Sequence, residues 1–194
     1  MRLTTVADPE AAAVKCAEAL ALLLGHALAE RGVFVQHYGS TLLDASLLLL
    51  PLMRFLPARD PRVRATVLAI AEELTVDGLV LRYRVDDTDD GLSGEEGTFT
   101  ICSFWLVSAL VEIGELARAR GLCERLLSFA SPLNLYAEEI DAGTGRHLGN
   151  FPQAFTHLAL INAVMHVIRA EAQLELGAPG AIASSPVGES ARTS

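Results

Sequence analysis

Three segments of this chain are apolar on nearly every side of a helix. They are residues Thr41–Leu56, Thr98–Ile113 and Gln153–Ile168. A helix that is hydrophobic all round is buried on every side. The intervening segments Asp60–Thr75 and Glu115–Ala130 are amphipathic, with one apolar stripe opposite a charged face. The sequence therefore predicts an all-α fold in which outer and inner helices alternate.

The longer polar loops support the same arrangement. Residues 31–40, 76–97 and 131–151 each precede an inner helix. In an up-and-down array of helices, loops placed in this way gather at one end. The pattern predicts three helical hairpins of an α/α toroid, with these loops forming one rim.

The chain divides into three parts. Residues 1–32 contain the first outer helix, which begins at the Asp8-Pro9 cap. Residues 33–176 contain the rest of the helical array. Residues 177–194 are rich in Ala, Gly, Pro and Ser, and we expect them to form a disordered tail.

Composition narrows the class of protein. The 194 residues are 51% hydrophobic, which is enough for a substantial core. The net charge of -9 and the scattered arginines argue against a nucleic-acid partner. The longest apolar runs are shorter than the roughly 18 residues that cross a membrane. The cysteines are widely spaced in apolar contexts, so we expect reduced core thiols and a cytoplasmic location.

Two adjacent carboxylates, Glu138 and Glu139, lie in the third rim loop. Neighbours in an extended loop point to opposite sides, so Glu138 shares a face with Tyr136 and Ile140. Partial desolvation there would strengthen a carboxylate as a base on water. The alternative is that both glutamates are solvated loop charges, and spacing alone favours this simpler interpretation.

Other rim residues are candidates for binding rather than catalysis. Arg82 in the second loop is planar with several donors and suits the paired hydroxyls of a sugar. Trp105 is a core residue by default and a sugar-stacking platform in the sharper interpretation. The acidic run before Glu96 lacks EF-hand spacing, and the histidines lack ligand spacing. We therefore expect neither a metal site nor a cofactor.

Several segments together resemble glycoside hydrolase family 15, the glucoamylase-like family that includes a bacterial and archaeal trehalase branch. They are FVQHYGS (34–40), LDASL (43–47), Arg82-Tyr83, EGTF…CSFW (96–105) and AEEID…GRHLGNFPQAFTH (137–157). The resemblance covers about Val33 to Val167. It implies an (α/α)6 toroid of twelve helices and inverting hydrolysis of α-glucosidic bonds, with trehalose or malto-oligosaccharides as substrates.

The resemblance also assigns roles. The family's general base falls on Glu138 and its sugar-binding arginine on Arg82. Glu96 and Trp105 fall near the next rim segment, and His37 and Tyr38 on the first. These four residues are weaker candidates for substrate contacts.

The chain departs from the family in one important respect. The family's general acid lies on a Trp-Glu motif, whereas the only tryptophan here, Trp105, is followed by Leu106. Six of twelve helices are expected, so the chain resembles the C-terminal half of such an enzyme. The alternatives are a non-catalytic sugar-binding remnant and a helical interaction module. Exposed apolar helices would then pair with a complementing N-terminal half or with a second copy.

Overall fold

The fold was obtained as a computed structural model, which describes residues 31–84 and 98–177. These residues are mostly helical, with very short strands at the connections. The helices are η1 (Ala45–Leu48, a 3-10 helix), α2 (Leu49–Leu52), α3 (Pro61–Glu73), α4 (Thr100–Glu112), α5 (Leu116–Ser128) and α6 (Ala154–Gly177). The strands are β1 (Thr75–Val76), β2 (Leu79–Val80), β3 (Thr98–Phe99), β4 (Glu139–Ile140) and β5 (His147–Leu148).

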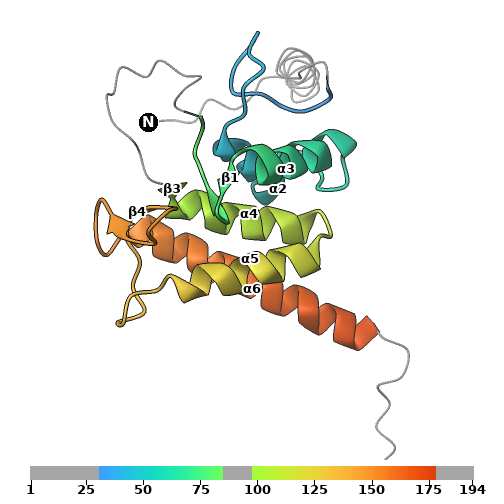
Figure 1. The fold of residues 1–194 in the computed structure, drawn as a ribbon. Coiled ribbons are helices and arrows are strands. Elements are labelled where there is room, and N and C mark those ends of the chain that lie inside the picture. Colours follow the sequence, from blue (N-terminus) through green and yellow to red (C-terminus); the bar gives the residue numbers. More distant parts are fainter. Residues whose placement is uncertain (1–30, 85–97, 178–194) are drawn as a thin grey trace, which may run out of the picture.

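Helix α4 is the centre of the fold. Helices α2 and α3 lie on one side of it and α5 and α6 on the other (Figure 1). Most of its side chains are buried, including Phe104, Val107 and Ala109, which are fully inaccessible. The prediction that residues 98–113 form an inner helix is therefore confirmed.

Helices α3 and α5 cover α4 with one face each. Asp60 caps α3 by accepting the Arg62 backbone N–H at 2.9 Å, and Pro61 occupies the first turn. The apolar stripe expected on α3 is buried, with Val63, Val67 and Ile70 inaccessible. Both helices confirm the amphipathic segments read from the sequence, with ends that differ by one or two residues.

Helix α6 approaches α4 through small residues. Ala163 is inaccessible, and Ala159 is buried one turn earlier. The opposite side of α6 is apolar but exposed. We call this surface the α6 apolar face: Phe155, Leu158, Ile161, Met165 and Ile168. The prediction of burial on every side is thus wrong for α6, because these five side chains remain 38 to 68% exposed among the described residues.

The predicted helix Thr41–Leu56 is also wrong in extent. Only Ala45–Leu52 is helical, as η1 and α2. The carboxylate of Asp44 accepts the Ser46 backbone N–H at 2.7 Å and so starts the helix late. The chain turns away after α2, where Arg54 takes a left-handed backbone conformation with φ 56°.

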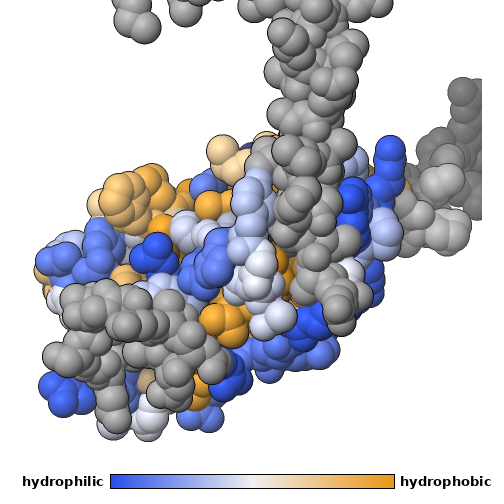
Figure 2. Space-filling model, turned by 90° about the horizontal axis from the view of Figure 1, so that it is seen from above, coloured by the Kyte–Doolittle hydropathy of each residue, from blue (hydrophilic) through white to orange (hydrophobic). Residues whose placement is uncertain are grey.

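Some expectations lie outside the described residues. These are nearly all of the first outer helix at 1–32, the tail after Gly177, and the part of the second rim loop that holds Glu96. None of the described helices is long and apolar enough to cross a membrane. Viewed from above α3, hydrophobic and hydrophilic residues are mixed on the surface (Figure 2).

Candidate active site

A small antiparallel sheet gathers the third rim loop at the N-terminal end of α4. Its strand order is β3-β4-β5, with Thr98 opposite Ile140 and Glu139 opposite Leu148. The turn between β4 and β5 is held by Asp141, whose carboxylate accepts the backbone N–H and the hydroxyl of Thr144 at 2.6 Å. Both hydrogen bonds lower the pKa of Asp141, and the bond from the Thr144 hydroxyl contributes more than the bond from its backbone N–H.

Glu138 immediately precedes β4 and is half-buried. Its carbonyl accepts the backbone N–H of Thr100 at 2.9 Å, which places it against the first turn of α4. Tyr136, two residues earlier, is buried and meets the Phe104 ring edge-on at 5.6 Å. The Tyr136 hydroxyl donates to the Leu126 carbonyl at 3.1 Å. The backbone that carries Glu138 is thus fixed by the core.

Asn150 is the direct partner of the Glu138 side chain. Its Nδ2 donates to Oε2 of Glu138 at 2.9 Å. Asn150 lies before α6, which begins at Ala154. A signal was available in Gly149, because a glycine beside a polar residue at the end of a hairpin often allows a close backbone approach.

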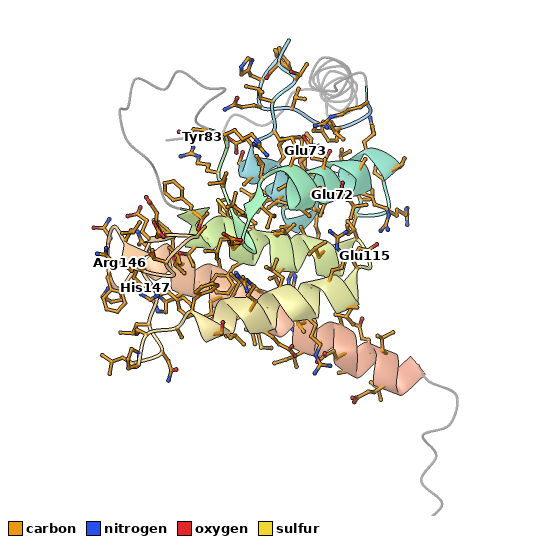
Figure 3. All side chains as sticks on the ribbon, in the orientation of Figure 1. Glu72, Glu73, Tyr83, Glu115, Arg146 and His147 are labelled. Atoms are coloured by element: carbon orange, nitrogen blue, oxygen red, sulfur yellow. The ribbon has the colours of Figure 1, made fainter. Side chains whose placement is uncertain are left out.

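Arg82 comes from the segment that follows β2. Its carbonyl accepts the backbone N–H of Ala45 at 2.8 Å, and its exposed guanidinium lies 5.6 Å from the centre of the Tyr83 ring. Tyr83 of this segment and His147 of β5 lie toward the same end of the helical layers (Figure 3).

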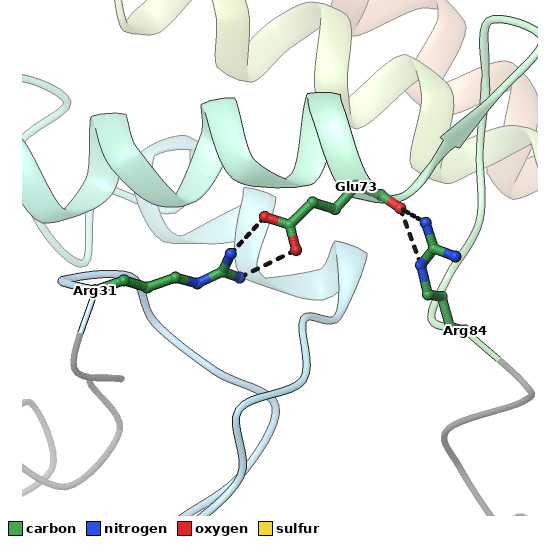
Figure 4. A network of polar contacts seen from close by, with 3 residues as sticks. All are labelled: Arg31, Glu73 and Arg84. Carbon is green, nitrogen blue, oxygen red and sulfur yellow. Dashed lines mark hydrogen bonds and ion pairs between the residues drawn. The ribbon is translucent and has the colours of Figure 1, made fainter.

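The Arg82 segment is anchored to the end of α3 by Glu73. The Glu73 carbonyl accepts two bonds from Arg84, at 2.7 and 3.2 Å, and its carboxylate pairs with Arg31 at 2.5 Å (Figure 4). These groups are exposed, so the Arg31–Glu73 ion pair contributes little free energy. The contacts instead fix positions, because the segments that contain Arg31 and Arg84 are both held at Glu73.

The thiol of Cys102 is buried in the first turn of α4. Burial raises the pKa of Cys102 to about 12, the Asp44 carboxylate adds to the increase, and the Arg82 charge opposes it. Helix η1, which Asp44 caps, packs on α4, and its Ala45 N–H bonds to the Arg82 carbonyl, while Glu138 bonds to Thr100 in the first turn of α4. We find no direct contact between Arg82 and Glu138 among the described residues.

The remaining candidates are not brought to Glu138. Trp105 lines a groove of about 380 Å³ between α2, α4 and α6, together with Met53, Phe155 and other residues. His37 and Tyr38 lie on an exposed loop beside α2 and α3, and Nδ1 of His37 lies 3.1 Å from the Tyr38 carbonyl. Glu96 is outside the described residues.

The two histidines beside the hairpin serve the fold. Nε2 of His147 lies 2.8 Å from the Phe129 carbonyl, and His157 accepts the Tyr136 backbone N–H at 3.3 Å. Across residues 31–84 and 98–177 we see no cluster of three potential metal ligands. The hydrogen bonds at this site join the Glu138 carboxylate to the Asn150 amide, and the Arg82 guanidinium lies on the separate segment after β2.

Comparison with known proteins places this geometry in a family. The model of glycosyl hydrolases family 15 matches residues 8–165. The chain belongs to that family. Within it, a trehalase from Mycolicibacterium smegmatis is 72% identical over 165 residues, covering 85% of this chain and 25% of that protein. A trehalase from Mycobacterium tuberculosis is 77% identical over 153 residues, covering 79% of this chain and 22% of that protein.

Solved structures give the same picture of the fold. A glycosidase in complex with glucose superposes with a TM-score of 0.66 at 21% identity, covering 84% of this chain and 46% of that chain. The family 15 chain described here thus spans about a quarter of the length of the trehalases it matches.

Proposed function

We propose that this chain carries the general base of a family 15 glycoside hydrolase that cleaves α-glucosidic bonds with inversion. Glu138 is the base. The observation that carries the proposal is its half-buried carboxylate, which Asn150 orients, on a backbone whose carbonyl accepts the Thr100 N–H at the α4 terminus. Trehalose is the substrate we favour over malto-oligosaccharides, because the relatives at 72 and 77% identity are trehalases.

The proposed chemistry transfers two protons. Glu138 takes a proton from water as that water attacks the anomeric carbon from the face opposite the leaving oxygen. A second carboxylic acid protonates the leaving oxygen, and the attack inverts the anomeric configuration. A carboxylate at the rim suits the first role because water can reach it while the surrounding backbone is held by the core.

The sugar contacts are proposed from the rim residues. The exposed Arg82 guanidinium presents several donors in one plane, which suits two neighbouring hydroxyls of a glucosyl unit. We assign supporting contacts to His37, Tyr38, Glu96 and Trp105. Trp105 lines the groove between α2, α4 and α6 rather than lying beside Glu138, so it would contact a part of the substrate away from the cleaved bond.

The general acid is proposed to come from a polypeptide region outside this chain. The sequence has no Trp-Glu pair, since Leu106 follows Trp105. We propose that the three predicted hairpins form half of an (α/α)6 toroid and that the other half packs on the α6 apolar face. The free thiols of Cys102 and Cys123 support a cytoplasmic location.

Product analysis tests this function. The chain is mixed with trehalose, alone and together with the polypeptide that carries the Trp-Glu motif, and products are followed at once by proton NMR. Inversion releases α- and β-glucose in equal amounts, whereas retention releases α-glucose only. Turnover with inversion in the mixture supports the proposal. Retention contradicts the mechanism, and sugar binding without turnover in the mixture supports a non-catalytic remnant.

A second candidate function is a helical interaction module, and the α6 apolar face favours it. Five large hydrophobic side chains are exposed along one side of a single helix, at 38 to 68%. Contiguous exposed apolar surface on a soluble protein marks an interaction site. Binding of the partner without any hydrolysis of trehalose or maltose would favour this function over the enzyme.

A further inference from the structure

The Glu138 carboxylate is held through only one of its oxygens. Asn150 donates Nδ2–H to Oε2 at 2.9 Å and its backbone N–H to the same oxygen at 3.3 Å. The backbone N–H of Glu138 donates in return to the Asn150 carbonyl at 2.9 Å. Among the described residues, every hydrogen bond to this carboxylate ends on Oε2, so Oε1 remains available.

The contact depends on an irregularity at the end of the hairpin. The register of β4 and β5 pairs Glu139 with Leu148, and one further step would set Glu138 opposite Gly149. The backbone of Glu138 bonds to Asn150 instead, so Gly149 is an extra residue, as in a β-bulge. Such bulges redirect side chains and occur often beside active sites.

Gly149 makes the close approach possible. Its φ of 70° lies in the left-handed region, which glycine adopts without a steric cost. A Cβ at this position would meet Oε2 of Glu138 at 3.1 Å and Cβ of Glu138 at 3.2 Å. The conformation at the end of the hairpin therefore brings Asn150 within hydrogen-bond distance of the Glu138 carboxylate.

We propose that Asn150 is a positioning residue for Glu138: it engages Oε2 so that Oε1 is the oxygen that accepts the proton from water. The inference rests on the proposed function of Glu138 as the base. Two donors on one oxygen fix the orientation of the carboxylate and leave Oε1 to accept the proton.

The direct test is NMR of the folded chain, labelled with 13C at the glutamate side chains. Three-bond couplings report the side-chain rotamers of Glu138 in the wild type and in Asn150→Ala. We expect one dominant rotamer in the wild type and averaging over several in Asn150→Ala, because Oε2 loses the Nδ2 donor. The rotamers of Glu139 should stay unchanged. Asn162→Ala, at an exposed asparagine of α6, is the matched control.

Asn150→Asp provides a second variant of nearly the same size. It replaces the donor amide with a carboxylate beside Glu138, so like-charge repulsion should turn the Glu138 side chain away and populate other rotamers. An unchanged Glu138 rotamer in both folded variants would overturn the inference, even if the melting temperature falls. In that case Asn150 serves only to close the hairpin.

Kinetics separate this inference from the proposed function. In a trehalose-hydrolysing enzyme that contains the chain, Asn150→Ala should lower kcat about tenfold with KM little changed. Absence of turnover in the wild-type enzyme would count against the proposed function, whereas the NMR couplings decide the role of Asn150 without any turnover.

Discussion

At the scale of single residues, Glu138 shows how far a sequence argument reaches. Alternation along an extended loop sets Tyr136, Glu138 and Ile140 on one face; Tyr136 and Ile140 are buried, but so is Ala137 of the opposite face. Glu138 is only half-buried, because Gly149 breaks the register and the side chain turns toward Asn150. Alternation cannot foresee this, since a bulge depends on pairing with a second strand.

A prediction at this scale concerns the cap of α3. The Asp60 carboxylate accepts hydrogen bonds from the backbone N–H of Arg62 at 2.9 Å and from the Arg62 guanidinium at 2.6 Å. Asp60→Ala should lower the free energy of unfolding by about 1 kcal/mol at neutral pH, measured by urea denaturation.

The effect of Asp60→Ala should depend on pH. The side-chain bond from Arg62 lowers the pKa of Asp60 in the folded state. A lowered pKa stabilises the fold at pH above the unfolded value of about 4, and this contribution is lost as pH falls through the folded value. The difference in the free energy of unfolding between the wild type and Asp60→Ala should therefore become smaller at acid pH. A gap of constant size down to pH 2 would contradict this assignment.

At the scale of elements, long helices were predictable and short ones were not. The segments that became α3, α4, α5 and α6 have apolar patterns of many turns, so a helical period is visible in each. The strands contain two residues each, which is too few to show alternation. The helix expected over residues 41–56 shortened because Asp44 caps it late, and capping geometry involves a few atoms rather than a pattern.

The contact between α4 and α6 gives a prediction for elements. Ala163 is inaccessible at this contact. Ala163→Leu should destabilise the fold by about 1 to 3 kcal/mol, because added methyl groups force the two helices apart. Thermal unfolding followed by circular dichroism measures the loss. Ala172→Leu, at an exposed position of the same helix, is the control and should change stability little. Equal losses in both variants would show that α6 is not packed in this way.

At the scale of the whole molecule, the alternation of inner and outer helices predicted the central place of α4. It also predicted that apolar faces of inner helices would be exposed, and the α6 apolar face fits that expectation. The sequence contains no pattern that would identify what covers this face. The family match extends over residues 8–165, while the matched trehalases are about four times longer than the region they share with this chain.

The exposed face leads to a prediction about association. Ile161 lies on the α6 apolar face and is 59% exposed. The wild-type chain should associate at high concentration, and Ile161→Glu should shift it toward the monomer, because a charge at the centre of an apolar contact is costly to bury. Sedimentation velocity measures the change. Leu133→Glu, at a 74% exposed leucine on a loop, is the matched control. A monomeric wild type at high concentration would contradict the prediction.

The account depends most on Glu138 as the base, and the rate of trehalose hydrolysis tests this most directly. The measurement compares Glu138→Gln with Glu139→Gln in an enzyme that contains this chain. General base catalysis contributes about 10²- to 10⁴-fold, so Glu138→Gln should lower kcat by that factor. Glu139→Gln should retain most of the activity. Retained activity in Glu138→Gln, or an equal loss in both variants, would contradict the account.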